Sequence, residues 1–319
     1  MKQKNLLNLL RRIKSKKVVI TTHRKADVDA VASAFAISEL LDNPTIAFHE
    51  DPDEGARQLI EFLKIQPKEL GTLNPLEFDW LIVVDASSSA LVKASGNWKI
   101  FLVIDHHAPE GRDIIGEYNI IEPDAPATSE MIANRLYQRL SKNAAFALAC
   151  GIVSDTARFK SGRMETFYIL SKLMKKCGAL YAELLKYAEP TIKRSEQIAI
   201  LKGFQRLQIF EIGEYVIVAT EVGSSASDVA SHLADVANAA FAADWKENEG
   251  ETRMSARASR EFPVPLNVVM AKTAERLGGM GGGHKKAAGC SVKGKKPDEV
   301  LAVCIQVLRE LIPAYSESR

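Results

Sequence analysis

Histidine and aspartate side chains recur in this sequence at places where they could act together on one substrate. Most of them directly follow a short apolar segment: His23, Asp27 and Asp29 come after residues 17–22, Asp85 after residues 80–84, and Asp105, His106 and His107 after residues 100–104. Asp155 ends a long uncharged stretch, and an isolated carboxylate there is costly to bury. Mixed imidazole and carboxylate groups suit Mn²⁺, Mg²⁺ or Zn²⁺, and the absence of cysteine from this set of residues disfavours metals that prefer thiolates.

Six candidate ligands from this set, two histidines and four aspartates, are too many for one catalytic metal ion, which needs open coordination positions. They suit two ions about 3.5–4 Å apart that share a bridging carboxylate. Such a pair lowers the pKa of bound water and holds phosphoryl oxygens. We therefore expect hydrolysis of a phosphate ester or anhydride through in-line attack of a bound hydroxide. Taken singly, Asp85 or Asp105 could instead cap a helix, but the recurrence at three segment ends favours the metal site.

The elements that must position these residues are alternating strands and helices. Residues 17–22, 80–84 and 100–104 are short apolar runs typical of buried parallel strands. Helical patterns cover residues 30–41, 129–140, 144–152 and 164–176. The alternation predicts an α/β domain with a parallel sheet and helices on both of its faces. Because ligands bind at the carboxyl ends of parallel strands, the side chains that follow the strands are expected to converge.

The pattern changes in the second half of the chain. Residues 181–208 are helical and rich in charge, and they are followed by predicted strands at 214–222, 251–259 and 284–292 and predicted helices at 266–277 and 297–311. We divide the chain into a catalytic domain (1–190), a helical linker (191–210) and a smaller α/β domain (211–319). The smaller domain contains a glycine-rich segment, residues 278–289, that matches neither a P-loop nor a dinucleotide fingerprint. Its backbone N–H groups could bind an anion, with His284 and Lys285 as further donors. A flexible loop without a binding role explains the glycines equally well.

These motifs together resemble the DHH phosphoesterase superfamily. They match as His23-x-x-x-Asp27-x-Asp29, then Asp85, then Asp105-His106-His107, then Asp155. The resemblance implies two Mn²⁺ ions, with Mg²⁺ or Co²⁺ as substitutes. One ion would be held by His23, Asp27 and Asp85, and the other by Asp29, Asp85, His106 and Asp155. His107 would then face the scissile phosphate, and Asp105 would support the histidines.

The second half resembles the DHH-associated C-terminal substrate-binding domain. The residues that carry this likeness are Gly281, Gly282, Gly283 and His284, within a Gly-Gly-Gly-His-x-x-Ala-Ala-Gly signature, and the strand around Arg257. The resemblance implies that these residues bind the substrate away from the scissile bond. The layout is most similar to the nano-RNase/pAp-phosphatase (NrnA-like) group. Ala26 and Ala32 stand where many members of the group have proline and glycine. This difference does not affect the metal ligands, but it leaves the exact subgroup, and hence the substrate, undecided.

The composition of the chain limits which partners and which cellular compartment are expected. Lys plus Arg number 42 and Asp plus Glu 40, so a dominant basic surface for nucleic acid or membrane is absent. The longest apolar run is far below the roughly 20 residues that a bilayer needs. The four cysteines form no C-x-x-C pair, which favours a reducing compartment. We expect a cytoplasmic, Mn²⁺-dependent exoribonuclease that cleaves short oligoribonucleotides, pAp or linear dinucleotides. We expect no membrane partner, and the protein could form a homodimer. The alternatives are a RecJ-like single-strand exonuclease, a cyclic-di-AMP phosphodiesterase, an inorganic pyrophosphatase and a non-catalytic nucleotide-binding module.

Overall fold

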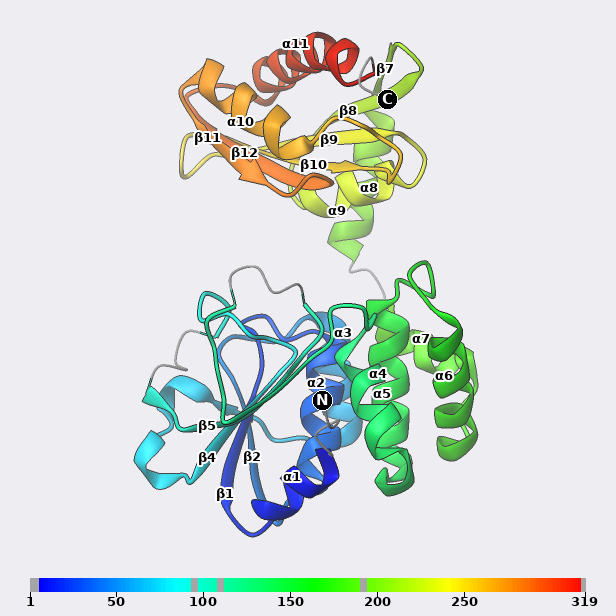
Figure 1. Cartoon of the computed structure of the whole chain (residues 1–319). Coiled ribbons are helices and arrows are strands. Elements are labelled where there is room, and N and C mark those ends of the chain that lie inside the picture. Colours follow the sequence, from blue (N-terminus) through cyan, green and yellow to red (C-terminus); the bar gives the residue numbers. More distant parts are fainter. Residues whose placement is uncertain (1–5, 93–96, 108–111, 190–193, 317–319) are drawn as a thin grey trace. The chain divides into compact units, whose positions relative to one another are not determined.

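The computed structural model describes residues 6–92, 97–107, 112–189 and 194–316 (Figure 1). The chain forms two compact units, Met1–Thr191 and Ile192–Arg319, which we describe separately. Among the described residues, no helix has both the length and the apolar composition that a membrane crossing requires. Both units are α/β structures, each built around one six-stranded sheet, in agreement with the predicted fold class.

The N-terminal unit contains a fully parallel sheet in the order β3-β2-β1-β4-β5-β6. Its strands are β1 (Lys17–Thr21), β2 (Asn43–Phe48), β3 (Lys68–Glu69), β4 (Trp80–Val84), β5 (Ile100–Asp105) and β6 (Tyr118–Ile121). The three predicted strands, now β1, β4 and β5, are confirmed, whereas β2, β3 and β6 were not foreseen. The strand order reverses between β1 and β4, and the connections that follow these two strands run in opposite directions. Such a switch point is where open α/β sheets bind ligands.

The helices of this unit lie on one side of the sheet, some against the strands and others against neighbouring helices. They are α1 (Leu6–Arg12), α2 (Val28–Ser38), α3 (Glu54–Leu63), α4 (Thr128–Leu136), α5 (Lys142–Asp155), α6 (Met164–Cys177) and α7 (Tyr181–Ala188), and all contribute to one core with Val18 and Ile82. The other face, with Val19 and Leu81, is covered by loops and short 3₁₀ turns in the part of the chain that the structure describes. The expectation of helices on both faces was therefore wrong. Turn-forming residues such as Asn74 and Pro75 break the connection into β4 before a helix can form.

The C-terminal unit is a mixed sheet between two layers of helices (Figure 1). Its strands lie in the order β11 (Met280–Gly283), β12 (Ala287–Lys293), β10 (Glu251–Ala258), β9 (Ala239–Lys246), β8 (Tyr215–Val222) and β7 (Gln208–Ile212). Only the β8–β9 pair is parallel. Helices α8 (Arg194–Gln205) and α9 (Ala226–Ala234) cover one face, and α10 (Leu266–Leu277) and α11 (Pro297–Ser316) cover the other.

One sequence prediction needs adjustment in this unit. The glycine-rich segment is not a loop: residues 280–283 form the edge strand β11, which pairs with β12. The proposed linker, 191–210, contains α8, which packs against α9 and β8 of this unit. Residues 190–193, where the linker would begin, lie outside the described residues. The predicted helices at 266–277 and 297–311 and the strands at 214–222 and 251–259 are confirmed.

Candidate metal centre

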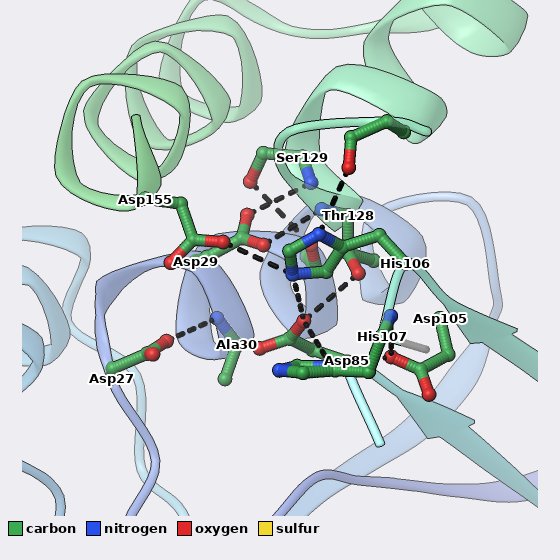
Figure 2. A network of polar contacts seen from close by, with 12 residues as sticks. Asp27, Asp29, Ala30, Asp85, Asp105, His106, His107, Thr128, Ser129 and Asp155 are labelled. Carbon is green, nitrogen blue, oxygen red and sulfur yellow. Dashed lines mark hydrogen bonds and ion pairs between the residues drawn. The ribbon is translucent and has the colours of Figure 1, made fainter. Parts of the chain in front are cut away.

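The structure brings all eight histidine and aspartate side chains of the N-terminal motifs to the carboxyl edge of the parallel sheet. Figure 2 labels all of them except His23. His23 follows β1, Asp85 follows β4, and the Asp-His-His run ends β5 and continues beyond it. Asp27 and Asp29 begin α2, and Asp155 ends α5. Ligand atoms lie within 4.8 Å of one another in three overlapping groups: His23, Asp27 and Asp85; Asp29, His106 and Asp155; and Asp85, His106 and His107.

Asp85 occupies the middle of the cluster. Its Oδ2 lies 3.5 Å from His23 Nε2, and its Oδ1 lies 3.5 Å from His106 Nε2. The two oxygens of one buried carboxylate thus face two different histidines. The backbone of Asp85 has a φ of 57°, a left-handed conformation that few non-glycine residues adopt and that clusters at functional sites. No helix begins in residues 86–92, so Asp85 does not act as the helix cap considered above.

One group of ligands lies on either side of Asp85. On one side, His23 Nε2 is 3.8 Å from Asp27 Oδ2, while Asp27 Oδ1 accepts a hydrogen bond of 2.9 Å from Ala30 N and so caps α2. On the other side, His106 Nε2 is 3.0 Å from Asp155 Oδ2. The helix cap therefore holds Asp27 in place beside His23.

Helix α4 supplies contacts that sequence analysis missed. Its first two backbone N–H groups donate to Asp29, from Thr128 to Oδ2 at 2.7 Å and from Ser129 to Oδ1 at 2.8 Å. The Thr128 hydroxyl also donates to Asp85 Oδ1 at 2.9 Å. Free N–H groups at a helix start are a natural site for a carboxylate. The sequence predicted that a helix starts at residue 129, and a helix start offers free N–H groups. Nothing in the sequence indicates that these groups bind a carboxylate about a hundred positions away.

Gly151 lets α5 approach this cluster closely. A Cβ atom at this position would lie 2.3 Å from Ser129 Oγ and 2.9 Å from Asp29 Oδ1. Every residue from 144 to 153 is buried, which explains the uncharged stretch before Asp155. The small residue at position 151 therefore keeps Asp29 and Ser129 where the cluster needs them.

The two consecutive histidines are oriented by different partners. His106 Nδ1 lies 3.0 Å from the Ala125 carbonyl oxygen, which directs Nε2 into the cluster. His107 Nδ1 lies 2.7 Å from Asp105 Oδ1, and the other oxygen of Asp105 accepts a 2.5 Å hydrogen bond from the Ser87 hydroxyl. Asp105 therefore supports His107 directly, whereas His106 is supported by the backbone. Ser87 was not recognised from the sequence.

The side chains present fit a divalent cation. His106 Nε2 is buried and has no hydrogen-bond partner in the described structure, although carboxylate oxygens surround it. Burial alone lowers the pKa of His23, but Asp27 and Asp85 outweigh it and raise this pKa to about 10. Burial likewise lowers the pKa of His106, and Asp155, Asp85 and Asp29 raise it to about 10. Burial, with the charges of Asp85 and Asp155, raises the pKa of Asp29. Positive charge is therefore stabilised at this place, and a metal ion would supply it.

The candidate substrate-binding residues lie in the C-terminal unit. Arg257, on β10, donates 2.8 Å and 3.0 Å hydrogen bonds to Ser227 Oγ and the Ala256 carbonyl. Ala287 on β12 pairs with Arg257, and its carbonyl accepts a 2.8 Å hydrogen bond from His284 N. Arg257 and His284 are thus both neighbours of Ala287, which places these two candidate substrate-binding residues close together.

Close packing accounts for two of the three motif glycines. A Cβ at Gly281 would lie 2.3 Å from the Met270 carbonyl oxygen of α10. At Gly283, φ is 132° and a Cβ would lie 2.7 Å from Ala288 Cα. A Cβ at Gly282 would meet nothing within 4 Å. Packing therefore leaves only Gly282 without a structural explanation.

Comparison with known proteins agrees with this arrangement. Residues 17–152 match the model of the DHH family N-terminal domain, and residues 214–310 match the DHHA1 domain. An uncharacterized protein of Methanocaldococcus jannaschii is 30% identical over 322 residues, which cover 93% of this chain and 96% of that protein. The chain belongs to the DHH family. It is a DHH phosphoesterase with a DHHA1 domain, as the sequence motifs predicted.

Other relatives of this DHH phosphoesterase have assigned activities. The cyclic-di-AMP phosphodiesterase GdpP of Geobacillus thermodenitrificans is 30% identical over 95% of this chain, which spans 48% of that protein. The bifunctional oligoribonuclease and PAP phosphatase NrnA of Thermus thermophilus is 23% identical over 92% of this chain and 89% of that protein. The fold matches the crystal structure of an exopolyphosphatase-related protein from Bacteroides fragilis, with a TM-score of 0.77 over 99% of this chain and 100% of that one at 15% identity.

Proposed function

We propose that this DHH protein is a metal-dependent phosphoesterase that removes nucleotides from short oligoribonucleotides, cleaves linear dinucleotides, or removes a phosphate from pAp. The observation that carries the proposal is the placement of Asp85, whose two carboxylate oxygens face His23 and His106 separately. A carboxylate in this position can bridge two metal ions. Two-ion centres are suited to displacement at phosphorus.

The ligand sets that we propose follow the groups in the structure. His23, Asp27 and Asp85 would hold one Mn²⁺ ion, and Asp29, Asp85, His106 and Asp155 would hold the second, with Mg²⁺ or Co²⁺ as substitutes. When bound, the ions supply a water of lowered pKa and stabilise charge on the phosphoryl oxygens. Thr128 and Ser129 fix the orientation of two of these carboxylates through hydrogen bonds.

Residues outside the ligand sets would bind and orient the substrate. His107 shares its Nδ1 proton with Asp105, and its side chain is 53% exposed, so Nε2 is available to the phosphate. Asp105 raises the pKa of His107 through this hydrogen bond, which favours the form that donates from Nε2. In the other unit, Arg257, His284 and the Gly281–Gly283 strand would bind the part of the substrate away from the scissile bond, as a guanidinium suits phosphate.

The choice of nucleotide substrates rests on the relatives. Both relatives with assigned activities act on nucleotides: NrnA is an oligoribonuclease and PAP phosphatase, and GdpP a cyclic-di-AMP phosphodiesterase. Cyclic-di-AMP is therefore the second candidate substrate. We also propose that the protein works in the cytoplasm without a membrane partner, as a monomer or homodimer, and that its domains span 1–190 and 211–319 with a linker between them.

A timed digest with Mn²⁺ tests the proposal. RNA dimers, pentamers and an RNA of about 24 residues are mixed in equal amounts, with cyclic-di-AMP and pyrophosphate assayed in parallel and EDTA added to one series. We expect rapid loss of the short RNAs, persistence of the long one and no activity in EDTA. Asp85→Asn should be inactive. Asp42→Asn, which alters an exposed aspartate paired with Lys14, is the matched control and should retain full activity.

Other outcomes would redirect the proposal. Loss of the long RNA at a comparable rate would indicate a RecJ-like exonuclease. Preferred cleavage of cyclic-di-AMP would favour the second candidate, and preferred cleavage of pyrophosphate a pyrophosphatase. Binding of nucleotides without turnover in any metal would indicate a non-catalytic module. Full activity of Asp85→Asn would exclude the bridging role.

A further inference from the structure

A group of side chains with large apolar surfaces, three of them exposed and one half-buried, follows Asp155 along the chain. We call it the aromatic rim and define it as Phe159, Met164, Phe167 and Tyr168. Phe167 is 52% exposed, Tyr168 67% and Met164 82%. The Phe159 and Phe167 rings stack on each other, with centroids 4.9 Å apart and an interplanar angle of 29°. Core packing does not account for three such side chains in contact with solvent on the first turns of α6.

The rim is fixed to the same elements that hold the candidate metal centre. Asp155 ends α5, and the next residues turn sharply, with positive φ at Ala157, Arg158 and Phe159 of 46°, 59° and 72°. Three successive non-glycine residues in this conformation mark a strained turn. The Thr156 hydroxyl accepts a 3.1 Å hydrogen bond from Phe159 N and so holds the turn closed. The backbone therefore places Phe159 only one tight turn beyond a candidate ligand.

Helix α4 makes the second connection between the rim and the metal centre. Glu130 is buried and accepts 2.5 Å hydrogen bonds from Arg163 Nη2 and Thr166 Oγ1, at the start of α6. The residue before it, Ser129, donates its N–H to Asp29. The start of α4 thus contacts Asp29 of the acidic cluster through Ser129 and the first turn of α6 through Glu130. The rim residues on α6 are held at the site end of this unit.

Basic residues alternate with the rim residues. Arg158 and Lys160 flank Phe159, and Arg163 precedes Met164, against one acid, Glu165, in residues 156–168. Arg158 pairs with Glu189 and Arg163 with Glu130, which holds both arginines in defined positions and offsets their charges. The exposed rings are therefore the feature that suits a nucleotide, since every base has a face for stacking.

We propose that the aromatic rim stacks a nucleobase of the substrate, with Phe167 as the main contact. The inference rests on the proposed function and restricts it, because a base-stacking surface selects nucleotides over pyrophosphate or polyphosphate. Phe167 would then be a specificity-determining residue that lies outside the metal ligand sets. Its contribution should appear in KM rather than in the chemical step.

Steady-state kinetics with two substrates test this inference. One substrate is a linear diadenosine dinucleotide, and the other is the same phosphodiester with both bases removed. Phe167→Ala should raise KM for the dinucleotide about tenfold, in the range measured for loss of one stacked base, with little change in kcat. It should leave kcat/KM for the abasic compound unchanged. Phe167→Trp should restore the dinucleotide KM. Phe62→Ala is the matched control, since Phe62 is also half exposed, at 49%, but packs with Phe146 and Tyr187 on other helices.

A binding measurement separates failure of this inference from failure of the proposed function. A dinucleotide that carries 2-aminopurine is titrated into the full chain with the Asp85→Asn substitution, and stacking is detected as quenched fluorescence. Quenching that Phe167→Ala abolishes supports the rim even if the parent protein hydrolyses no dinucleotide. Hydrolysis with an unchanged KM in Phe167→Ala supports the function and overturns the rim. An equal loss of kcat/KM for the abasic compound in Phe167→Ala also overturns the rim. A changed oligomeric state of Phe167→Ala in sedimentation overturns it too, because it would show that this face joins two copies of the chain.

Discussion

The two units are built on sheets of equal strand number, but their motifs are held in opposite ways. In the N-terminal unit the motif residues are polar side chains buried among one another, such as Asp29 and Asp85, and core packing gives no reason for them. In the C-terminal unit His284 is exposed, Arg257 is half-buried and the remaining motif residues are glycines, of which close packing alone requires Gly281 and Gly283. Buried charge therefore indicates function directly. A glycine motif indicates function only at positions that the fold does not already explain, which here is Gly282.

The largest effect in this comparison is expected from Asp85→Asn. Asparagine tolerates the left-handed backbone at this position, and its Oδ1 can still accept from Thr128. Burial and the charges of Asp27 and Asp155 raise the pKa of Asp85, so the charged form is disfavoured without a metal. We expect activity to fall by more than about a hundredfold, beyond the loss for an outer partner of a metal ligand. The melting temperature in EDTA should stay close to that of the parent, because removal of a buried charge offsets the loss of its pairing with His23 and His106.

Two readouts decide this prediction. Activity is measured with Mn²⁺, and thermal unfolding is followed by circular dichroism in EDTA. A variant that melts well below the parent in EDTA would show that Asp85 supports the fold rather than the site.

The next effect is a contrast within the glycine motif. Gly281→Ala forces a Cβ against the Met270 carbonyl and should destabilise the protein by about 1–3 kcal/mol, as overpacking does. Gly282→Ala meets no atom and should change stability by less than about 0.5 kcal/mol. Urea unfolding followed by tryptophan fluorescence, with Trp245 on β9 as the reporter in this unit, measures both variants. Equal stability losses would mean that the motif acts as one structural unit. A loss of activity in Gly282→Ala alone would locate binding at that residue.

The smallest effect concerns protons. The pKa values of His23 and His106 are about 10 without metal, above the 6.5 of a histidine in an unfolded chain. Their protonated forms stabilise the metal-free protein fully below pH 6.5, and this contribution is lost as the pH rises to about 10. Because Mn²⁺ requires neutral imidazole, its binding near neutral pH should release up to about two protons, and its apparent affinity should increase with pH.

Titration calorimetry in two buffers of different ionisation enthalpy measures the released protons. His23→Gln should reduce the number by about one. Identical heats in the two buffers would show that both histidines are already neutral in the metal-free protein.

The sequence was sufficient for part of the fold and for the composition of the candidate site. The strand before Asp85 and the strand that ends in Asp105 were recognisable because they are continuous apolar runs. The residues beyond them were assembled by one general rule of parallel sheets. Strand β2 was missed because it begins with Asn43 and Pro44. Strand β11 was missed because glycine carries no alternation of apolar and polar side chains.

Contacts between distant segments were the other omission. Thr128 and Gly151 carry no chemical signature of their own, and their roles depend on which helix lies opposite. Ser87 is one of three consecutive serines, and only the position of Asp105 selects it. Local pattern therefore predicts which groups react, whereas the groups that orient them follow from the packing.

The hydrogen bonds between Asp29 and the start of α4 join residues 99 and 100 positions apart, and Asp155 lies further along the chain still. A site assembled from such distant segments cannot exist in a partly synthesised or partly folded chain, because the entropy of closing so long a loop is compensated only when the helices pack. Metal would therefore reach this protein after folding rather than guide it. Cations in a refolding mixture should leave the folding rate unchanged and slow unfolding, so that metal prolongs the life of the mature protein without helping to produce it.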